Sequence, residues 1–169
     1  MNMLFEHNIV LVIDDNPDIR DAVTTLIDSA KLYKVISAKN GVEGLAAIKK
    51  HRRFFGYGKS DLLCIVLDIM MPEMDGLTML KKLRKTEIFT PYIPVIMLTG
   101  YEDISKVHAV IDQNSGLSCE YIMKDDVDIK LLPTIERIFR YTDAAENMVD
   151  EMRDKGLLRI NELKKKENK

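Results

Sequence analysis

The chain has 169 residues, of which 46% are hydrophobic and 31% charged, as expected of a soluble globular protein. This length fits one domain with some additional chain. The formal net charge of -2 argues against an overall basic field for nucleic acid. The two cysteines, Cys64 and Cys119, form no CxxC motif. They therefore argue against a zinc site or a disulfide framework, and favour a reducing, cytoplasmic compartment.

The first apolar run, Ile9–Ile13, is too short for a signal peptide or a membrane span and predicts a buried strand. We therefore expect no membrane contact. A helix is predicted next, because Asn16 can cap it and Pro17 suits its first position. Apolar residues then recur at helical spacing and predict one core-facing side: Ile19, Val23, Leu26, Ile27 and Ala30.

Strands and helices are predicted to alternate along the rest of the chain. The further strands are Lys34–Ala38, Leu62–Leu67, Pro94–Leu98 and Glu120–Met123. The further helices are Asn40–Lys50, Asp75–Lys85, Glu102–Asp112 and one that starts between Asp128 and Pro133. This alternation predicts an α/β, doubly wound parallel sheet with helices on both faces. Right-handed crossovers then place every strand's carboxyl end at one edge, where such sheets bind ligands.

Polar side chains end four of the five predicted strands. Asp14 and Asp15 follow the first strand, Asp68 the third, Thr99 the fourth and Lys124 the fifth. Neighbouring carboxylates repel each other unless a cation joins them, and a set of oxygen ligands at an open site suits Mg²⁺. A phosphate group could bridge such a metal and Lys124. One carboxylate could itself be the nucleophile of a phosphoryl transfer, giving an acyl phosphate whose charge the metal and the lysine neutralise.

Four motifs in this order resemble the receiver domain of two-component response regulators: VLVIDDNPDIR, LDIMMPEMDG, VIMLTG and YIMK. The resemblance covers roughly residues 8 to 140. It implies a flavodoxin-like sheet with strand order 2-1-3-4-5 and a role in two-component phosphorelay signalling. It also implies that the protein is not an enzyme in the usual sense, because receivers catalyse only their own phosphorylation and dephosphorylation.

The resemblance assigns a role to each residue at the strand ends. Asp68 matches the phosphoacceptor. Asp14 and Asp15 match the acidic pair that holds Mg²⁺ together with Asp68, and the backbone carbonyl of Met70 is a further ligand. A sensor histidine kinase or a phosphotransfer protein is the implied phosphodonor.

Two further positions match the switch residues of the family. Thr99 matches the switch hydroxyl and Tyr121 the aromatic residue that turns inward with it. Lys124 matches the lysine that contacts the phosphate and faces Asp68 at rest. The implied switch is a population shift that remodels the face formed by the fourth helix, fifth strand and fifth helix. A homodimer could form through this face.

One position departs from the family pattern. The family has proline after the lysine, joined by a cis bond, whereas this chain has Asp125 after Lys124. A cis bond without proline costs about 2.5–4 kcal/mol, so we expect a trans bond. Asp125 could pair with Lys124 or repel the phosphoryl group. A receiver that binds partners without phosphorylation is therefore an alternative. A haloacid-type phosphatase is disfavoured, since its DxD pattern is absent at Asp14.

One insertion exceeds the usual family spacing, and a tail follows the matched region. The insertion Lys50–Ser60 contains arginines and aromatic residues, and could contact a partner or nucleic acid; a solvated loop is the favoured interpretation. Residues 141–169, after a receiver domain at residues 1–140, are expected to form a helical extension or a linker. Their near-heptad spacing could form a dimeric coiled coil. Alternatively, they could lead to an output domain, which would make this chain the receiver module of a larger protein.

Overall fold

The computed structural model describes residues 8–51, 61–86, 92–100 and 120–167. It contains a five-stranded sheet in the order β2-β1-β3-β4-β5, and all neighbouring strands are parallel. The strands are β1 (Ile9–Ile13), β2 (Lys34–Ala38), β3 (Leu62–Asp68), β4 (Val95–Thr99) and β5 (Glu120–Met123). The predicted fold class and strand order are therefore confirmed.

Four α-helices are described: α1 (Pro17–Ser29), α2 (Gly41–His51), α3 (Gly76–Thr86) and α5 (Val127–Glu167). A short 3-10 helix, η3 (Lys124–Asp126), joins β5 to α5. The helix predicted at Glu102–Asp112 and the insertion at residues 52–60 lie outside the described residues. The predicted start of the fifth helix, between Asp128 and Pro133, is wrong by one residue. Val127 already donates its backbone N–H to the carbonyl of Lys124, so η3 runs directly into α5.

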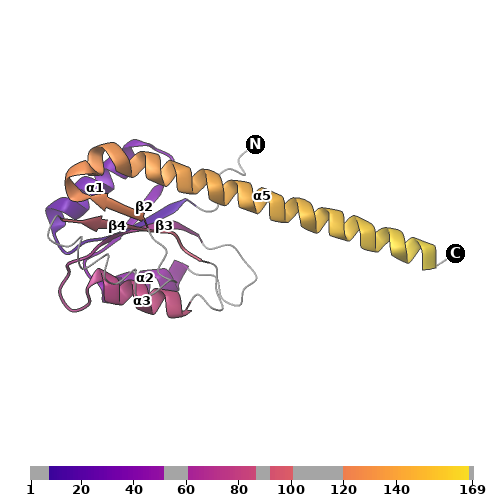
Figure 1. Cartoon of the computed structure of the whole chain (residues 1–169), viewed down its shortest axis with the longest axis horizontal. Helices are drawn as coiled ribbons and strands as arrows, with labels where there is room; N and C mark the ends of the chain where they lie inside the picture. The colour runs from indigo at the N-terminus through magenta and orange to yellow at the C-terminus, as the bar shows by residue number, and fades with distance from the viewer. Residues whose placement is uncertain (1–7, 52–60, 87–91, 101–119, 168–169) are drawn as a thin grey trace.

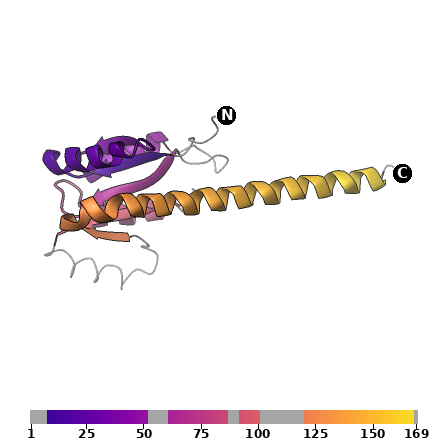
Figure 2. The same ribbon diagram turned by 90° about the horizontal axis from the view of Figure 1, so that it is seen from above.

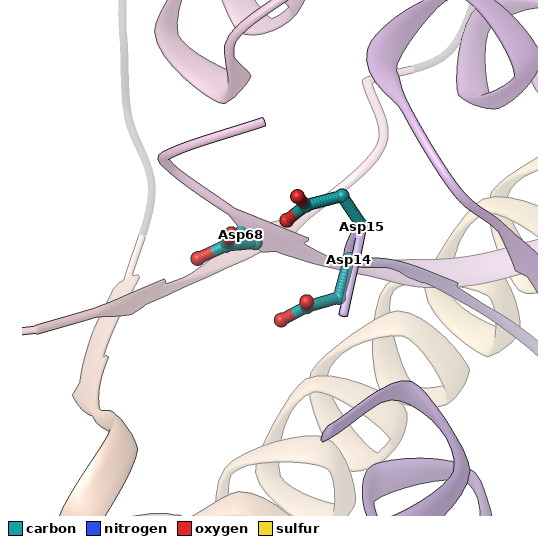
Figure 3. Close-up of side chains that lie close together, drawn as sticks. All are labelled: Asp14, Asp15 and Asp68. Carbon is teal, nitrogen blue, oxygen red and sulfur yellow. The ribbon is translucent and has the colours of Figure 1, made fainter. Parts of the chain in front are cut away.

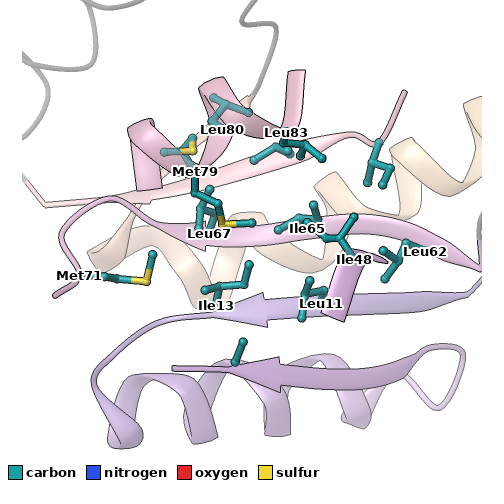
Figure 4. Packing of buried hydrophobic residues seen from close by; sticks show 14 of the residues in the cluster. Leu11, Ile13, Ile48, Leu62, Ile65, Leu67, Met71, Met79, Leu80 and Leu83 are labelled. Carbon is teal, nitrogen blue, oxygen red and sulfur yellow. The ribbon is translucent and has the colours of Figure 1, made fainter. Parts of the chain in front are cut away.

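The helices cover the sheet in two layers (Figure 1). On one face, Val23 and Ile27 from α1 pack with α5 against the sheet, and α5 contributes Leu131, Ile135 and Ile138. On the other face, Ile48 from α2 and three α3 residues pack against β1 and β3 (Figure 4): Met79, Leu80 and Leu83. Every residue of β1 and β3 is buried, as expected of central parallel strands.

Helix α1 begins as its sequence predicts. The side chain of Asn16 accepts hydrogen bonds from the backbone N–H groups of Asp18 at 2.9 Å and Ile19 at 3.4 Å. Pro17 occupies the first turn, where its missing N–H costs nothing. This cap fixes the point at which the chain leaves β1 and turns into α1.

The N-terminus of α3 is pinned against the carboxyl end of β3. The backbone N–H of Gly76 donates to the carbonyl of Ile69 at 2.9 Å. A Cβ atom on Gly76 would lie 2.1 Å from the backbone oxygen of Asp68, so no other residue fits without moving backbone. The side chain of Asp75 caps the helix by accepting the Thr78 N–H at 2.8 Å.

Helix α5 is much longer than the domain needs. Its 41 residues correspond to a length of about 60 Å at 1.5 Å per residue. The first part packs on the sheet, where Arg137 also forms an ion pair with Glu120 of β5. The second part projects beyond the sheet toward the C-terminus (Figures 1 and 2). Across the described part of the chain, no helix combines the length and apolar character of a membrane span.

Candidate functional site

The strand register brings the predicted residues together at one edge of the sheet. Ile13 of β1 is opposite Leu67 of β3, so Asp14 and Asp68 follow on adjacent strands. Asp68 pairs with Leu98, and Thr99 pairs with Met123, the residue before Lys124. The carboxyl ends of β1, β3, β4 and β5 therefore form one row of polar side chains.

The three carboxylates form a compact cluster (Figure 3). One oxygen from each of Asp14, Asp15 and Asp68 lies within 4.8 Å of the others. Asp14 is 1% exposed and Asp68 is 3% exposed, whereas Asp15 is exposed to solvent. The cluster is thus held in the protein on one side and open on the other. This geometry could hold a metal ion that keeps several of its waters.

Lys124 reaches into this cluster from the end of β5. Its Nζ atom lies 2.8 Å from Oδ1 of Asp68 and 3.3 Å from Oδ2 of Asp14. The expected proximity of Lys124 to Asp68 is therefore confirmed. The single ammonium group bridges two buried carboxylates, which leaves the cluster with an excess of negative charge.

The pKa values of Asp68 and Lys124 are both raised, for different reasons. Desolvation raises the pKa of Asp68, and the negative charge of Asp14 adds to this effect, while hydrogen bonds from Lys124 and the Ile69 N–H oppose it. Desolvation lowers the pKa of Lys124, but Asp68 and Asp14 outweigh it, so this pKa lies above its usual value. An isolated ion pair would lower the carboxyl pKa. Its rise here reflects burial and the second carboxylate.

Asp14 is held in place through both its side chain and its backbone. Its Oδ1 atom accepts the backbone N–H of Asn16 at 2.9 Å, and its Oδ2 atom contacts Lys124. Its backbone carbonyl accepts a hydrogen bond from Nη1 of Arg20 at 2.9 Å. No sequence motif predicted a role for Arg20. Its position in the first turns of α1, just after the acidic pair, is the signal that could have indicated one.

The predicted switch residues lie at or near the same edge. Thr99 is 3% exposed, and its hydroxyl donates to the carbonyl of Gly100 at 3.0 Å. Tyr121 lies on β5 and is 36% exposed, so its ring is not in the core. The side chain of Met70 is exposed, and the assignment of its carbonyl as a ligand stays a prediction.

The connection after Lys124 differs from a bend made by a cis proline. All described peptide bonds are trans, which confirms the prediction for Lys124 and Asp125. Within the described residues, Lys124 forms its ion pairs with Asp68 and Asp14, and Asp125 is exposed. Asp126 instead pairs with Lys130 at 2.7 Å, one turn along α5. The η3 turn therefore brings Lys124 to the carboxylates without a proline.

Comparison with known proteins agrees with this geometry. Residues 10–134 match the model of the response regulator receiver domain. The chain is 32% identical over 163 residues to the probable transcriptional regulator ycf27 of Porphyridium aerugineum, covering 95% of this chain and 59% of that protein. It is also 32% identical over 162 residues to the regulatory protein VanRc of Enterococcus gallinarum, covering 90% and 61%. The chain thus spans about three-fifths of the length of these relatives.

Solved structures show the same fold. The receiver domain of the histidine kinase CKI1 from Arabidopsis thaliana, complexed with Mg²⁺, has a TM-score of 0.66 and 25% identity, covering 80% of this chain and 94% of that one. Full-length FixJ from B. japonicum has a TM-score of 0.64 and 25% identity, covering 83% and 61%. Fold, strand-end chemistry and sequence similarity agree: the chain belongs to the family of response regulator receiver domains, which act in two-component signalling.

Proposed function

We propose that this receiver accepts a phosphoryl group on Asp68 from a histidine kinase or a phosphotransfer protein. The observation that carries the proposal is the contact of 2.8 Å between Lys124 Nζ and Asp68 Oδ1, beside two further carboxylates. An Asp68 oxygen would attack phosphorus while the bond from phosphorus to the donor's histidine nitrogen breaks. The imidazole then leaves with the electron pair of that bond. The product is an acyl phosphate on the protein.

The acidic cluster fits a bound Mg²⁺ ion. Asp14, Asp15, Asp68 and the backbone carbonyl of Met70 would supply an all-oxygen ligand set. The contacts of Lys124 support this assignment, because one ammonium group faces two buried carboxylates and leaves negative charge that a cation would balance. When bound, the ion would neutralise charge on the transferring phosphoryl group.

Thr99 and Lys124 would respond to the new phosphoryl group. Lys124 now contacts a carboxylate and would keep an anionic partner when the phosphoryl oxygens arrive. The Thr99 hydroxyl can turn from the Gly100 carbonyl to one of those oxygens. Tyr121 is partly exposed and would turn inward as Thr99 moves. This shift would change the surface formed by β5 and α5.

Several broader assignments rest on family membership. We take residues 1–140 as the receiver and residues 141–169 as its extension or linker. The chain would catalyse only its own phosphorylation and dephosphorylation, and would not act as an enzyme on other molecules. We place it in the cytoplasm. The hybrid signal transduction histidine kinase D of Dictyostelium discoideum, 34% identical over 148 residues, supports a kinase partner. Another relative, RpaA of Synechocystis, is named a DNA-binding regulator, and this chain covers 50% of it. We assign no nucleic-acid contact to the part matched here.

Phosphorylation by a small donor tests the proposal directly. Incubation with acetyl phosphate and Mg²⁺ should add one phosphoryl group to the native protein and none to Asp68→Asn, because the nucleophilic oxygen is lost. Intact-mass spectrometry reads the result. Asp28→Asn removes an exposed carboxylate at the opposite end of α1 and should leave the modification unchanged. If several donors fail on the native protein, a receiver that binds partners without phosphorylation becomes the better assignment.

Removal of a single metal ligand tests the magnesium site. Saturating Mg²⁺, at about a hundred times its Kd, should raise the Tm of the native protein by roughly 5–10 °C. Asp15→Asn should lose most of this rise without destabilising the metal-free protein, because Asp15 is exposed. Asp18→Asn, an exposed carboxylate three residues along, is the matched control and should keep the full rise. Thermal scans with and without EDTA measure the rise in Tm of each variant. An equal rise in Asp15→Asn and Asp18→Asn would contradict the assignment.

A further inference from the structure

The projecting part of α5 carries large apolar side chains in solvent. Tyr141 is 71% exposed, Met148 is 54% exposed and Met152 is 64% exposed. Their spacing of seven and then four residues places them on one side of the helix. The domain's own packing ends just before them: Phe139 meets Tyr33 edge to face, with ring centroids 6.3 Å apart. Figures 1 and 2 show this part of α5 leading away from the sheet.

Two series of apolar or small residues run beside Tyr141 and Met148 and continue the face with which α5 packs on its own sheet. Leu131 and Ile138 are buried there, and steps of seven residues from them lead to Ala145 and Met152. A second series of the same step starts at the buried Ile135 and continues along the chain through Thr142, Val149 and Gly156. No charged residue occupies either series between residues 131 and 156.

A strict seven-residue repeat has a geometric consequence. A straight α-helix repeats every 3.6 residues, so a stripe that returns every 3.5 residues winds slowly around it. The stripe stays in contact with a partner when the partner is another helix with the same repeat, in a left-handed supercoil. A globular partner would instead favour a wider apolar face.

The composition of the projecting part also favours a partner helix. Most of the stability of a helix in a protein comes from packing of its apolar face, and Gly156 costs ~1 kcal/mol relative to alanine. A second copy supplies the same repeat and a self-complementary face through a two-fold axis. The β-branched residues Thr142 and Val149 in one series favour two strands.

We propose that α5, from Tyr141 to the region of Gly156, pairs with α5 of a second copy as a two-stranded coiled coil. This inference does not depend on the chemistry at Asp68. The paired helices would hold two receivers at a fixed spacing. Because α5 begins three residues after Lys124, the paired helices would start next to the acidic site.

Sedimentation velocity of the full chain across a wide range of concentrations tests the pairing. The native protein should be a dimer that dissociates on dilution. The double variant Met148→Glu, Met152→Glu should raise the dissociation constant at least about a hundredfold, since four carboxylates would be buried per dimer. Asn147→Glu adds a charge that helical spacing places away from the stripe, and should leave the dimer intact. Both altered methionines are exposed, so the Tm of the receiver fold should be unchanged at concentrations where both proteins are monomeric.

Three results would overturn the proposal. A native protein that is monomeric at every concentration removes the second copy as the partner, including the case in which the monomer binds lipid vesicles or DNA instead. A double variant that dimerises as well as the native protein places the contact elsewhere, for example on β5 and the first part of α5. Equal losses in the double variant and in Asn147→Glu would show that general charge, and not the stripe, controls association.

Discussion

Replacing Gly76 with alanine is expected to destabilise the domain by about 3 kcal/mol and to abolish phosphoryl acceptance at Asp68. Overpacking usually costs about 1–3 kcal/mol. The upper end applies because the new Cβ would lie 2.1 Å from the backbone oxygen of Asp68 and 3.1 Å from the Cα of Ile69. These are backbone atoms that cannot rotate away, so β3 or α3 must move. The Tm should fall by roughly 6–12 °C.

Gly44→Ala is the matched control for this substitution. Gly44 is also a buried helical glycine, but its new Cβ would meet the ends of side chains: Ile13 Cδ1 at 2.5 Å and Met79 Cε at 3.1 Å. These atoms can shift, and alanine gains about 1 kcal/mol over glycine in a helix. Urea unfolding and intact mass after acetyl phosphate treatment compare the two variants. Similar stability losses, or normal phosphorylation of Gly76→Ala, would refute the proposed role of this close approach.

The sequence predicted the sheet well because buried parallel strands are short and apolar. Ile9–Ile13, Lys34–Ala38 and Glu120–Met123 have the predicted bounds. β3 is longer than predicted by one residue, Asp68, and β4 is shifted by one residue so that it ends at Thr99. Both residues still pair with the neighbouring strand although their side chains are polar. Hydrophobic pattern alone marks where an apolar run stops, and backbone pairing can continue beyond that residue.

The candidate site was predicted from strand ends, because parallel topology forces those residues to one edge. The contacts that support the site residues were not predicted from the sequence. The hydrogen bond from Arg20 to the Asp14 carbonyl depends on how α1 is placed. The approach of Gly76 to Asp68 depends on how α3 is docked. The η3 turn after Lys124 likewise replaces the missing proline with a local backbone shape that no side-chain pattern specifies. Each depends on tertiary geometry between segments, which periodicity does not encode.

Lys124→Met is expected to destabilise the metal-free protein by about 2 kcal/mol at neutral pH. The substitution removes the ammonium group that lies 2.8 Å from Asp68 and 3.3 Å from Asp14, and leaves two buried carboxylates facing each other. Breaking a fully buried ion pair costs about 3–5 kcal/mol. The lower figure allows for the 29% exposure of the lysine side chain. Lys130→Met is the matched control: its pair with Asp126 is exposed and should contribute about 0.5 kcal/mol or less.

The pH dependence of this loss identifies its cause. The pKa of Asp68 in the folded protein is raised above its usual value of 3.8, so ionised Asp68 disfavours folding. The stabilisation that comes from the protonated Asp68 is fully present below the pKa of the unfolded state. It is lost as the pH rises through the pKa of the folded state. Without Lys124 this pKa should rise further. The pKa of Lys124 is raised above 10.5, so its contribution is present below that value and lost as the pH rises through the folded pKa. The difference in unfolding free energy between the native protein and Lys124→Met should therefore be largest at pH values above the pKa of Asp68 and below that of Lys124.

Urea unfolding across this pH range measures the difference for the native protein, Lys124→Met and Lys130→Met. The double variant Lys124→Met, Asp68→Asn should recover most of the lost free energy, because the asparagine carries no charge for the missing ammonium to balance. Saturating Mg²⁺ should also recover part of it in the single variant, since the cation would join the same carboxylates. A loss that is independent of pH and is not recovered by Asp68→Asn would mean that Lys124 stabilises the domain through packing of its side chain. The charge balance among Asp14, Asp68 and Lys124 would then not govern the stability of the acidic edge.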